Sequence, residues 1–150
     1  MEVLEFFKNY FNVDDENIAY SKEALNENTE IFVGDLNCKD EALIFYPNLK
    51  VIIGDAYFNN LVTAIALDNL SYIIGSAFFH SLKRADGLEK LKLIDGDAFF
   101  DMLVGSKGIK NLDTISGMSY FGSLKRSKYI DNINNEGPLY APRIRKKKVR

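Results

Sequence analysis

Apolar residues recur along this chain at a spacing much longer than the period of a helix or a strand. Segments of 21 residues that begin at Asp40, Leu61, Leu82 and Leu103 align with one another without a gap. A period near 20 residues with several fixed apolar positions is typical of a solenoid, in which each coil buries its apolar face only against its neighbours. The pattern therefore predicts a stack of coils, each with one strand and a return turn.

Each coil carries the same kinds of residue at the same positions, which form columns along the stack. The glycine column fits a turn or a close approach of two backbones, where a Cβ would clash or φ is positive. The columns are Leu49, Leu70, Leu91, Leu112; Ile52, Ile73, Ile94, Ile115; Gly54, Gly75, Gly96, Gly117; Ala56, Ala77, Ala98, Ser119; Tyr57, Phe78, Phe99, Tyr120; Phe58, Phe79, Phe100, Phe121; Tyr46, Leu67, Leu88, Ile109, Ile130; and Leu61, Leu82, Leu103, Leu124.

The repeat pattern LxNLxxIxGdAyFxxxL resembles the leucine-rich-repeat superfamily, in particular the irregular repeats of bacterial and phage proteins and of receptor L domains. The asparagine of the familiar repeat is not fixed at one ladder position here, although Asn48, Asn69, Asn111 and Asn132 recur just before the column leucine. The resemblance implies a parallel ladder of short strands and a protein-binding role, and it implies no chemistry. We expect an α+β repeat solenoid, a right-handed leucine-rich-repeat-like coil with about five or six short strands.

The rest of the chain predicts a cap, two imperfect coils and a tail. Residues 2–11 place apolar side chains at helical spacing, and Asp14 and Asp15 could cap a second short helix that runs towards Leu25. We therefore expect an N-terminal helical cap at residues 1–30, a solenoid at 31–141 and a basic tail at 142–150. Within the solenoid, residues 33–38 and 137–141 are predicted to be degenerate copies of the repeat.

The faces of the predicted strand indicate a binding surface. If residues 54–58 form a strand, Ala56 and Phe58 point inward, while Asp55 and Tyr57 point outward. The outward column would then form an aromatic stripe, and stripes of this kind usually mark a binding surface. The stripe comprises Asn37, Tyr57, Phe78, Phe99, Tyr120 and Tyr140, bordered by Asp55, Ser76, Asp97, Met118 on one side and Asn59, His80, Asp101, Gly122 on the other.

From this surface we select Tyr57, Phe78, Phe99, Tyr120, Tyr140, Asp55, Asp97 and His80 as candidate partner-binding residues. Two alternatives stay open. The rings could simply stack on one another, since cross-strand aromatic pairs stabilise a sheet. The register could instead be shifted so that Tyr57 is buried, or another segment could cover the stripe.

The sequence contains no pattern that indicates catalysis. One histidine, His80, and one cysteine, Cys38, are too few for a metal site built from those ligands, and Cys38 falls in the buried Phe58 column. Repetition explains the carboxylates at Asp35, Asp55, Asp97 and Asp101 better than acid–base chemistry does. No phosphate-cradling glycine loop is present. We expect neither an enzyme nor a cofactor or metal.

Charge is unevenly distributed and suggests the partner classes. The net charge is −2, but the tail holds 6 of the 19 basic residues, which leaves 13 basic residues against 21 acidic ones elsewhere. The basic residues of the tail are Arg143, Arg145, Lys146, Lys147, Lys148 and Arg150. A basic block of this kind usually stays solvated, and it could also contact an acidic partner or nucleic-acid phosphates.

Two functions of different classes follow from the sequence. The first is a protein-interaction module, an adaptor or inhibitor, which binds a protein partner through the aromatic stripe. The second is a nucleic-acid-associated protein that uses the tail, or an inhibitor that docks on the basic nucleic-acid-binding groove of another protein. The single cysteine, and the lack of a long apolar run, lead us to expect a cytoplasmic protein that does not insert into a membrane. We expect a monomer, or a homodimer paired through its edge strands.

Overall fold

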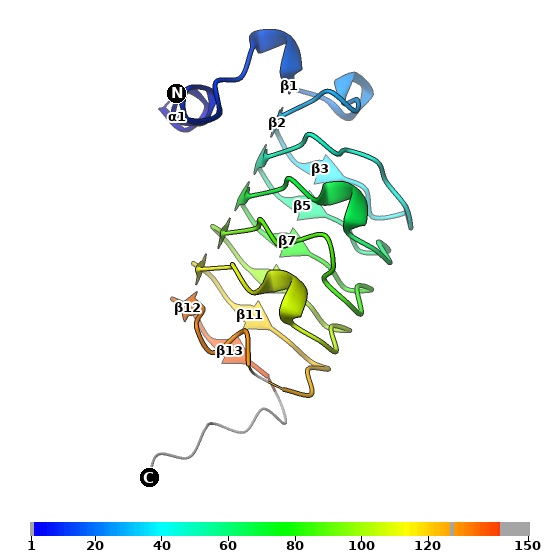
Figure 1. The fold of residues 1–150 in the computed structure, drawn as a ribbon, viewed down its shortest axis with the longest axis vertical. Helices are drawn as coiled ribbons and strands as arrows, with labels where there is room; N and C mark the ends of the chain where they lie inside the picture. The colour runs from blue at the N-terminus through cyan, green and yellow to red at the C-terminus, as the bar shows by residue number, and fades with distance from the viewer. Residues whose placement is uncertain (1, 127, 142–150) are drawn as a thin grey trace.

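The chain folds into a parallel β-solenoid of about five coils with a spacing of about 21 residues, as the computed structural model shows (Figure 1). The structure describes residues 2–126 and 128–141. The N-terminal helix lies at one end of the stack and the last strand lies at the other. The predicted repeat solenoid with parallel strands is therefore confirmed.

Each coil contributes one strand to each of two parallel sheets, which we call sheet A and sheet B. Sheet A has seven strands: β1 (Ile18–Ala19), β2 (Ile31–Val33), β4 (Val51–Ile53), β6 (Tyr72–Ile74), β8 (Leu93–Ile94), β10 (Thr114–Ile115) and β12 (Asn134–Asn135). Sheet B has six: β3 (Leu36–Asn37), β5 (Ala56–Tyr57), β7 (Ala77–Phe78), β9 (Ala98–Phe99), β11 (Ser119–Tyr120) and β13 (Leu139–Tyr140). Four short 3₁₀ turns complete the described elements: Asp15–Asn17, Lys22–Ala24, Ile65–Leu67 and Lys107–Ile109.

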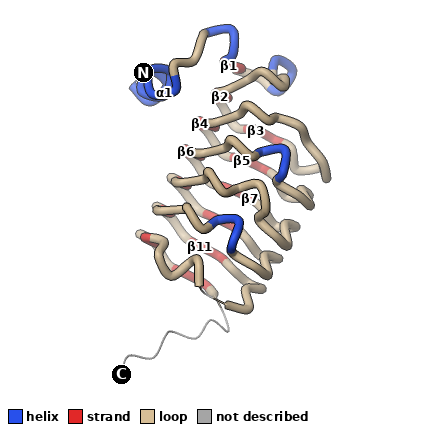
Figure 2. Tube along the Cα trace, in the orientation of Figure 1, coloured by secondary structure: helices blue, strands red, loops and turns tan. Residues whose placement is uncertain are grey.

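The prediction of one strand per coil is wrong, because each coil turns a corner and forms two short strands, one in each sheet. Gly54 and Asp55 form this corner between β4 and β5, so that only Ala56 and Tyr57 remain from the predicted strand (Figure 2). The glycine is required by close stacking: a Cβ on Gly54 would lie 2.2 Å from the backbone oxygen of Gly34, and one on Gly75 would lie 2.2 Å from that of Gly54. The glycine column is thus the line along which successive coils approach most closely.

The predicted inward and outward faces of the aromatic segment are confirmed. Ala56 and Phe58 are fully buried, whereas Asp55 and Tyr57 are partly exposed. The inner phenylalanines form a continuous stack, with ring centroids 5.3 Å, 5.2 Å and 5.4 Å apart along Phe58, Phe79, Phe100 and Phe121. Both leucine columns are buried beside them. Each coil therefore buries its apolar side chains on identical side chains of the next coil.

Both degenerate copies are genuine coils. In sheet B, Leu36 pairs with Ala56, and Ser119 pairs with Leu139. The first and last steps of the stack therefore span 20 residues, one fewer than the repeat of about 21. Leu139 occupies the inward Ala56 position but is 46% exposed, since no described coil follows it.

Cys38 is buried in the Phe58 column as expected, and this burial raises the pKa of its thiol to about 12.

The N-terminal segment contains the predicted first helix but not the second. Helix α1 spans Glu2–Phe11, whereas the segment from Asp14 to Leu25 forms two 3₁₀ turns and strand β1. Strand β1 pairs with β2 and extends sheet A by one strand. A helix of this length is only marginally stable by itself, so the tertiary pairing with β2 overrides the helical signal.

Helix α1 packs on the outer face of sheet A. Phe7 is buried in a cluster with Ile31 and Val51, and its ring lies 5.0 Å from that of Tyr72. The outward residues of the later strands β10 and β12, Thr114 and Asn134, are polar. The outer face of sheet A is therefore apolar beneath the helix and polar at β10 and β12. No helix in the described ranges is long and apolar enough to cross a membrane.

Replacing Gly96 by alanine should destabilise the stack by about 1–3 kcal/mol, the usual cost of overpacking. Its Cβ would lie 2.6 Å from the backbone carbonyl carbon of Gly75, so the two coils would have to separate. Gly105 is the matched control, because a Cβ there meets no atom within 4 Å. Urea unfolding should show a lower midpoint for Gly96→Ala and an unchanged one for Gly105→Ala. Equal midpoints would contradict the close-stacking role of the glycine column.

Candidate functional site

The outward aromatic residues of sheet B stack on one another over three successive coils, from Tyr57 to Phe99. The Tyr57 and Phe78 rings are 4.8 Å apart at an angle of 3°, and the Phe78 and Phe99 rings are 5.1 Å apart at 8°. All three side chains are partly buried by this arrangement. Ring stacking was one of the alternatives left open by the sequence, and it accounts for this part of the stripe.

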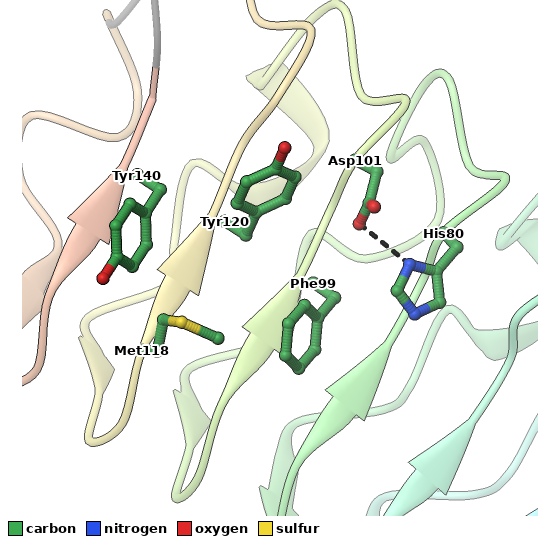
Figure 3. A pocket seen from close by; sticks show the side chains of 6 residues that line it. All are labelled: His80, Phe99, Asp101, Met118, Tyr120 and Tyr140. Carbon is green, nitrogen blue, oxygen red and sulfur yellow. Dashed lines mark hydrogen bonds and ion pairs between the residues drawn. The ribbon is translucent and has the colours of Figure 1, made fainter.

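The stack stops at Phe99. The Tyr120 and Tyr140 rings are 6.4 Å apart and tilted by 47°, and within residues 2–126 and 128–141 no ring contact joins Phe99 to Tyr120. Figure 3 shows that the hydroxyl groups of Tyr120 and Tyr140 point in opposite directions. The stripe is therefore regular at its N-terminal half and irregular at its C-terminal half.

Gly122 explains why Tyr120 leaves the stack. A Cβ on Gly122 would lie 3.2 Å from Cε2 of Tyr120, so the tyrosine ring occupies space next to the glycine that a side chain would need. The preceding coils carry Asn59, His80 and Asp101 at the position of Gly122. The Tyr120 ring thus lies over Gly122, just after the end of β11, where no side chain is present.

The break in the stack opens a hollow of about 440 Å³ on the outer face of sheet B. Met118 contributes to it at the column position that carries aspartate or serine in earlier coils, and its side chain extends from β11 towards β9 (Figure 3). The six lining residues are His80, Phe99, Asp101, Met118, Tyr120 and Tyr140. Four of the predicted partner-binding residues are thus brought together in one place, while Tyr57 and Phe78 lie outside the hollow.

His80 and Asp101 form the polar border of this hollow. Nδ1 of His80 donates a hydrogen bond to Oδ1 of Asp101, with 2.9 Å between the two atoms. The imidazole also lies 5.9 Å from the Phe78 ring and 5.5 Å from the Phe99 ring. Asp101 therefore orients His80 against the aromatic stack and keeps a carboxylate beside the hollow.

The aspartate column at the corner has a structural role that the sequence did not reveal. Each side chain accepts a hydrogen bond from a backbone N–H of the following coil, which links successive corners. The bonds are Asp55 N–H to Asp35 Oδ1 at 2.8 Å, Ser76 N–H to Asp55 Oδ1 at 2.8 Å, Asp97 N–H to Ser76 Oγ at 3.0 Å and Met118 N–H to Asp97 Oδ1 at 2.8 Å. The recurrence of Asp55 and Asp97 is thereby explained by the fold, and their contact with a partner stays a prediction.

This ladder ends where its next donor is missing. The Met118 side chain has no oxygen to accept a bond, and the residue one coil later at the same corner position is Pro138, which has no backbone N–H. A second ladder connects the opposite turns of the coils. Its bonds run from the side-chain amides of Asn48, Asn69 and Asn111 to the backbone oxygens of Glu27, Pro47 and Glu89.

The face that carries the stripe is negatively charged. Partial burial, and after it the carboxylates of Asp55 and Asp35, raise the pKa of the Tyr57 hydroxyl. Burial disfavours a charge of either sign, whereas the two carboxylates specifically disfavour a further negative charge at this surface. The sheet B face therefore favours cationic groups over anionic ones.

A second hollow, of about 400 Å³, lies away from sheet B and is basic. Its charged residues are Lys107, Lys125, Arg126 and Lys128, and Tyr129 lies beside them. Sequence reasoning missed this cluster because its residues come from two coils, although the period of 21 residues aligns Lys107 with Lys128. The predicted basic tail residues lie outside the described part of the chain.

The fold and these surfaces define a class, the parallel β-solenoids built from short repeats. In comparisons with protein-family models, curated proteins and solved structures, no significant match to the chain was found. Among the described residues, no group of three or more His, Cys, Asp or Glu side chains could hold a metal ion. The surfaces themselves therefore carry the indications of function.

Replacing Asp97 by alanine should destabilise the protein by about 1–2 kcal/mol, because the backbone N–H of Met118 loses its acceptor. Asp97→Asn is the matched control, since its amide oxygen can accept the same bond without the negative charge. Thermal or urea unfolding should show a loss for the alanine variant and near wild-type stability for the asparagine variant. If both variants lost the same stability, charge rather than the hydrogen-bond ladder would explain the aspartate column.

Proposed function

We propose that the protein is a non-enzymatic interaction module that binds a polypeptide partner through the outer face of sheet B. The observation that carries this proposal is the open hollow at the break of the aromatic stack. Its walls include one face of Phe99, the displaced ring of Tyr120 and the half-exposed ring of Tyr140. Aromatic side chains around a concave site provide most of the energy in many protein interfaces.

The stacking pattern concentrates this proposed function in the C-terminal coils. Tyr57 and Phe78 already have ring partners, so a bound protein gains less by covering them. Phe99, Tyr120, Tyr140 and His80 surround a space that the chain itself does not fill. These four residues are therefore the centre of the proposed interface, and Tyr57 and Phe78 form its margin.

The proposal includes a right-handed coil of the leucine-rich-repeat type in a cytoplasmic protein. Buried leucine columns, parallel strands and asparagine ladders support the repeat type, and crossovers between parallel strands are right-handed in about 98% of cases. Two strands per coil, rather than one, distinguish this chain from the simplest form of the repeat. The concave or flat sheet surfaces of such repeat proteins are common sites of protein binding.

Site-specific photocrosslinking tests the binding face. The full chain should be made with the photoreactive residue p-benzoylphenylalanine at position 120 and, as a control, at Tyr20, which is exposed outside sheet B. In nuclease-treated lysate of the native cell, we expect a discrete polypeptide adduct at position 120 and none at position 20. The absence of an adduct at 120, or the same adducts at both positions, would contradict the proposal.

The basic hollow favours a second candidate function, binding of a nucleic-acid strand. Lys107, Lys125, Arg126 and Lys128 could contact phosphates, and Tyr129 could stack on a base. The tail at 142–150 would add basic residues to the same interaction. This surface is separate from the aromatic stripe, whose bordering aspartates would repel phosphates.

The salt dependence of binding to single-stranded oligothymidine tests this second function. If Lys125 and Lys128 each contact a phosphate, the double variant Lys125→Gln/Lys128→Gln should lower the slope of log affinity against log salt by about 1.4. Lys92→Gln, at an exposed lysine outside the hollow, should leave the slope unchanged. Fluorescence anisotropy measures both. Binding that is absent, or equally affected by all three substitutions, would exclude a nucleic-acid site in the basic hollow.

A further inference from the structure

The hollow on sheet B combines a flat aromatic face with an adjacent carboxylate. Phe99 stacks on Phe78 through one face of its ring, at 5.1 Å, and lines the hollow where no further ring continues the stack. A planar group of a ligand could therefore occupy the next position of the stack. Such a group would stack on Phe99 at the position that the Tyr120 ring leaves empty.

Asp101 supplies the charge at the edge of this aromatic face. Its Oδ1 accepts the hydrogen bond from His80, and in the described part of the chain its Oδ2 accepts none. The Asp101 side chain is 36% exposed, so a ligand can reach it. A carboxylate with one engaged and one accessible oxygen is an acceptor for a donor group of a ligand.

The surrounding charge selects the sign of the ligand. Asp35, Asp55 and Asp97 accept backbone hydrogen bonds along the same face. An anion would be repelled by this face, and a purely apolar side chain would leave Asp101 unused. A cation with a flat, weakly hydrated surface satisfies both the ring and the carboxylate.

We propose that the hollow binds the guanidinium group of an arginine in a basic segment of a partner polypeptide. The guanidinium stacks on Phe99 and donates to Asp101 Oδ2, while Tyr120, Tyr140 and Met118 cover its sides. Arginine fits better than lysine, because its charged group is planar, stacks on aromatic rings and is more weakly hydrated than an ammonium group. This inference rests on the proposed function and specifies the chemistry of its partner.

Titration of the full chain with short peptides tests the inference. The probes are hexa-arginine, hexa-lysine and hexa-citrulline, because citrulline has the shape of arginine without its charge. Nuclear magnetic resonance of the Phe99, Tyr120 and Tyr140 rings reports the site, and shifts in these rings yield an affinity. We expect hexa-arginine to bind about tenfold more tightly than hexa-citrulline and several-fold more tightly than hexa-lysine. Equal affinity for arginine and citrulline would overturn the inference.

Two substitutions separate a built site from general attraction to an acidic protein. Asp101→Asn keeps the bond to His80 but removes the charge, and Phe99→Leu keeps an apolar side chain but removes the aromatic face. Each should weaken hexa-arginine binding by about tenfold, whereas Asp113→Asn, on the sheet A side, makes the same charge change and should have no effect. Equal effects of Asp101→Asn and Asp113→Asn would show diffuse attraction only and overturn the inference.

A variant with Arg143→Gln and Arg145→Gln tests the source of the arginine. If hexa-arginine binds wild-type and variant chains equally, an external segment is supported. If it binds only after these substitutions, the chain's own tail is the occupant, and the partner segment is overturned. A partner crosslinked at position 120 whose binding ignores Asp101→Asn and Phe99→Leu would keep the proposed function and reject this inference. Arginine binding without any crosslinked partner would reject the proposed function and with it the partner segment, and would leave only the preference of the hollow for a guanidinium group.

Discussion

The close approach of successive coils at the Gly-Asp corner is the constraint on which the rest of the structure depends. Without a side chain on Gly54 or Gly75, the backbone of one coil lies against the glycine of the coil before it. The same lack of a Cβ leaves room for the carboxylate, since a Cβ on Gly117 would lie 2.2 Å from Oδ1 of Asp97. Glycine and aspartate thus act together, one allowing the contact between coils and the other accepting its hydrogen bond.

Once the corners are in register, identical side chains lie above one another, and the departures from the repeat become the informative positions. Met118 and Gly122 both replace polar residues of the earlier coils, and both belong to the coil in which Tyr120 leaves the aromatic stack. The regular positions build the core and the ladders. The irregular positions produce the hollow, and their side chains belong neither to the core nor to the hydrogen-bond ladders.

The period of the sequence was sufficient to predict the solenoid, its imperfect end coils and the burial of Phe58. In a stack of coils, a residue at one position of the repeat packs against the residues at the same position in the neighbouring coils. The period could not predict two strands per coil, since the residues around Gly54 alternate in the same way whether the chain runs straight or turns. The position of helix α1 depends on contacts with Tyr72, far away in sequence. The hollow depends on a ring orientation that a residue type alone does not specify.

The polarity of sheet A has a consequence for the evolution of the array. Helix α1 occupies the outer surface next to β4 and β6, while the later strands present Thr114 and Asn134 to solvent. A whole coil could therefore be duplicated or lost beyond β8 without uncovering an apolar surface or moving the helix. Coil number, and with it the reach of the sheet B face, can vary by single insertions at this end, each adding about 4.8 Å.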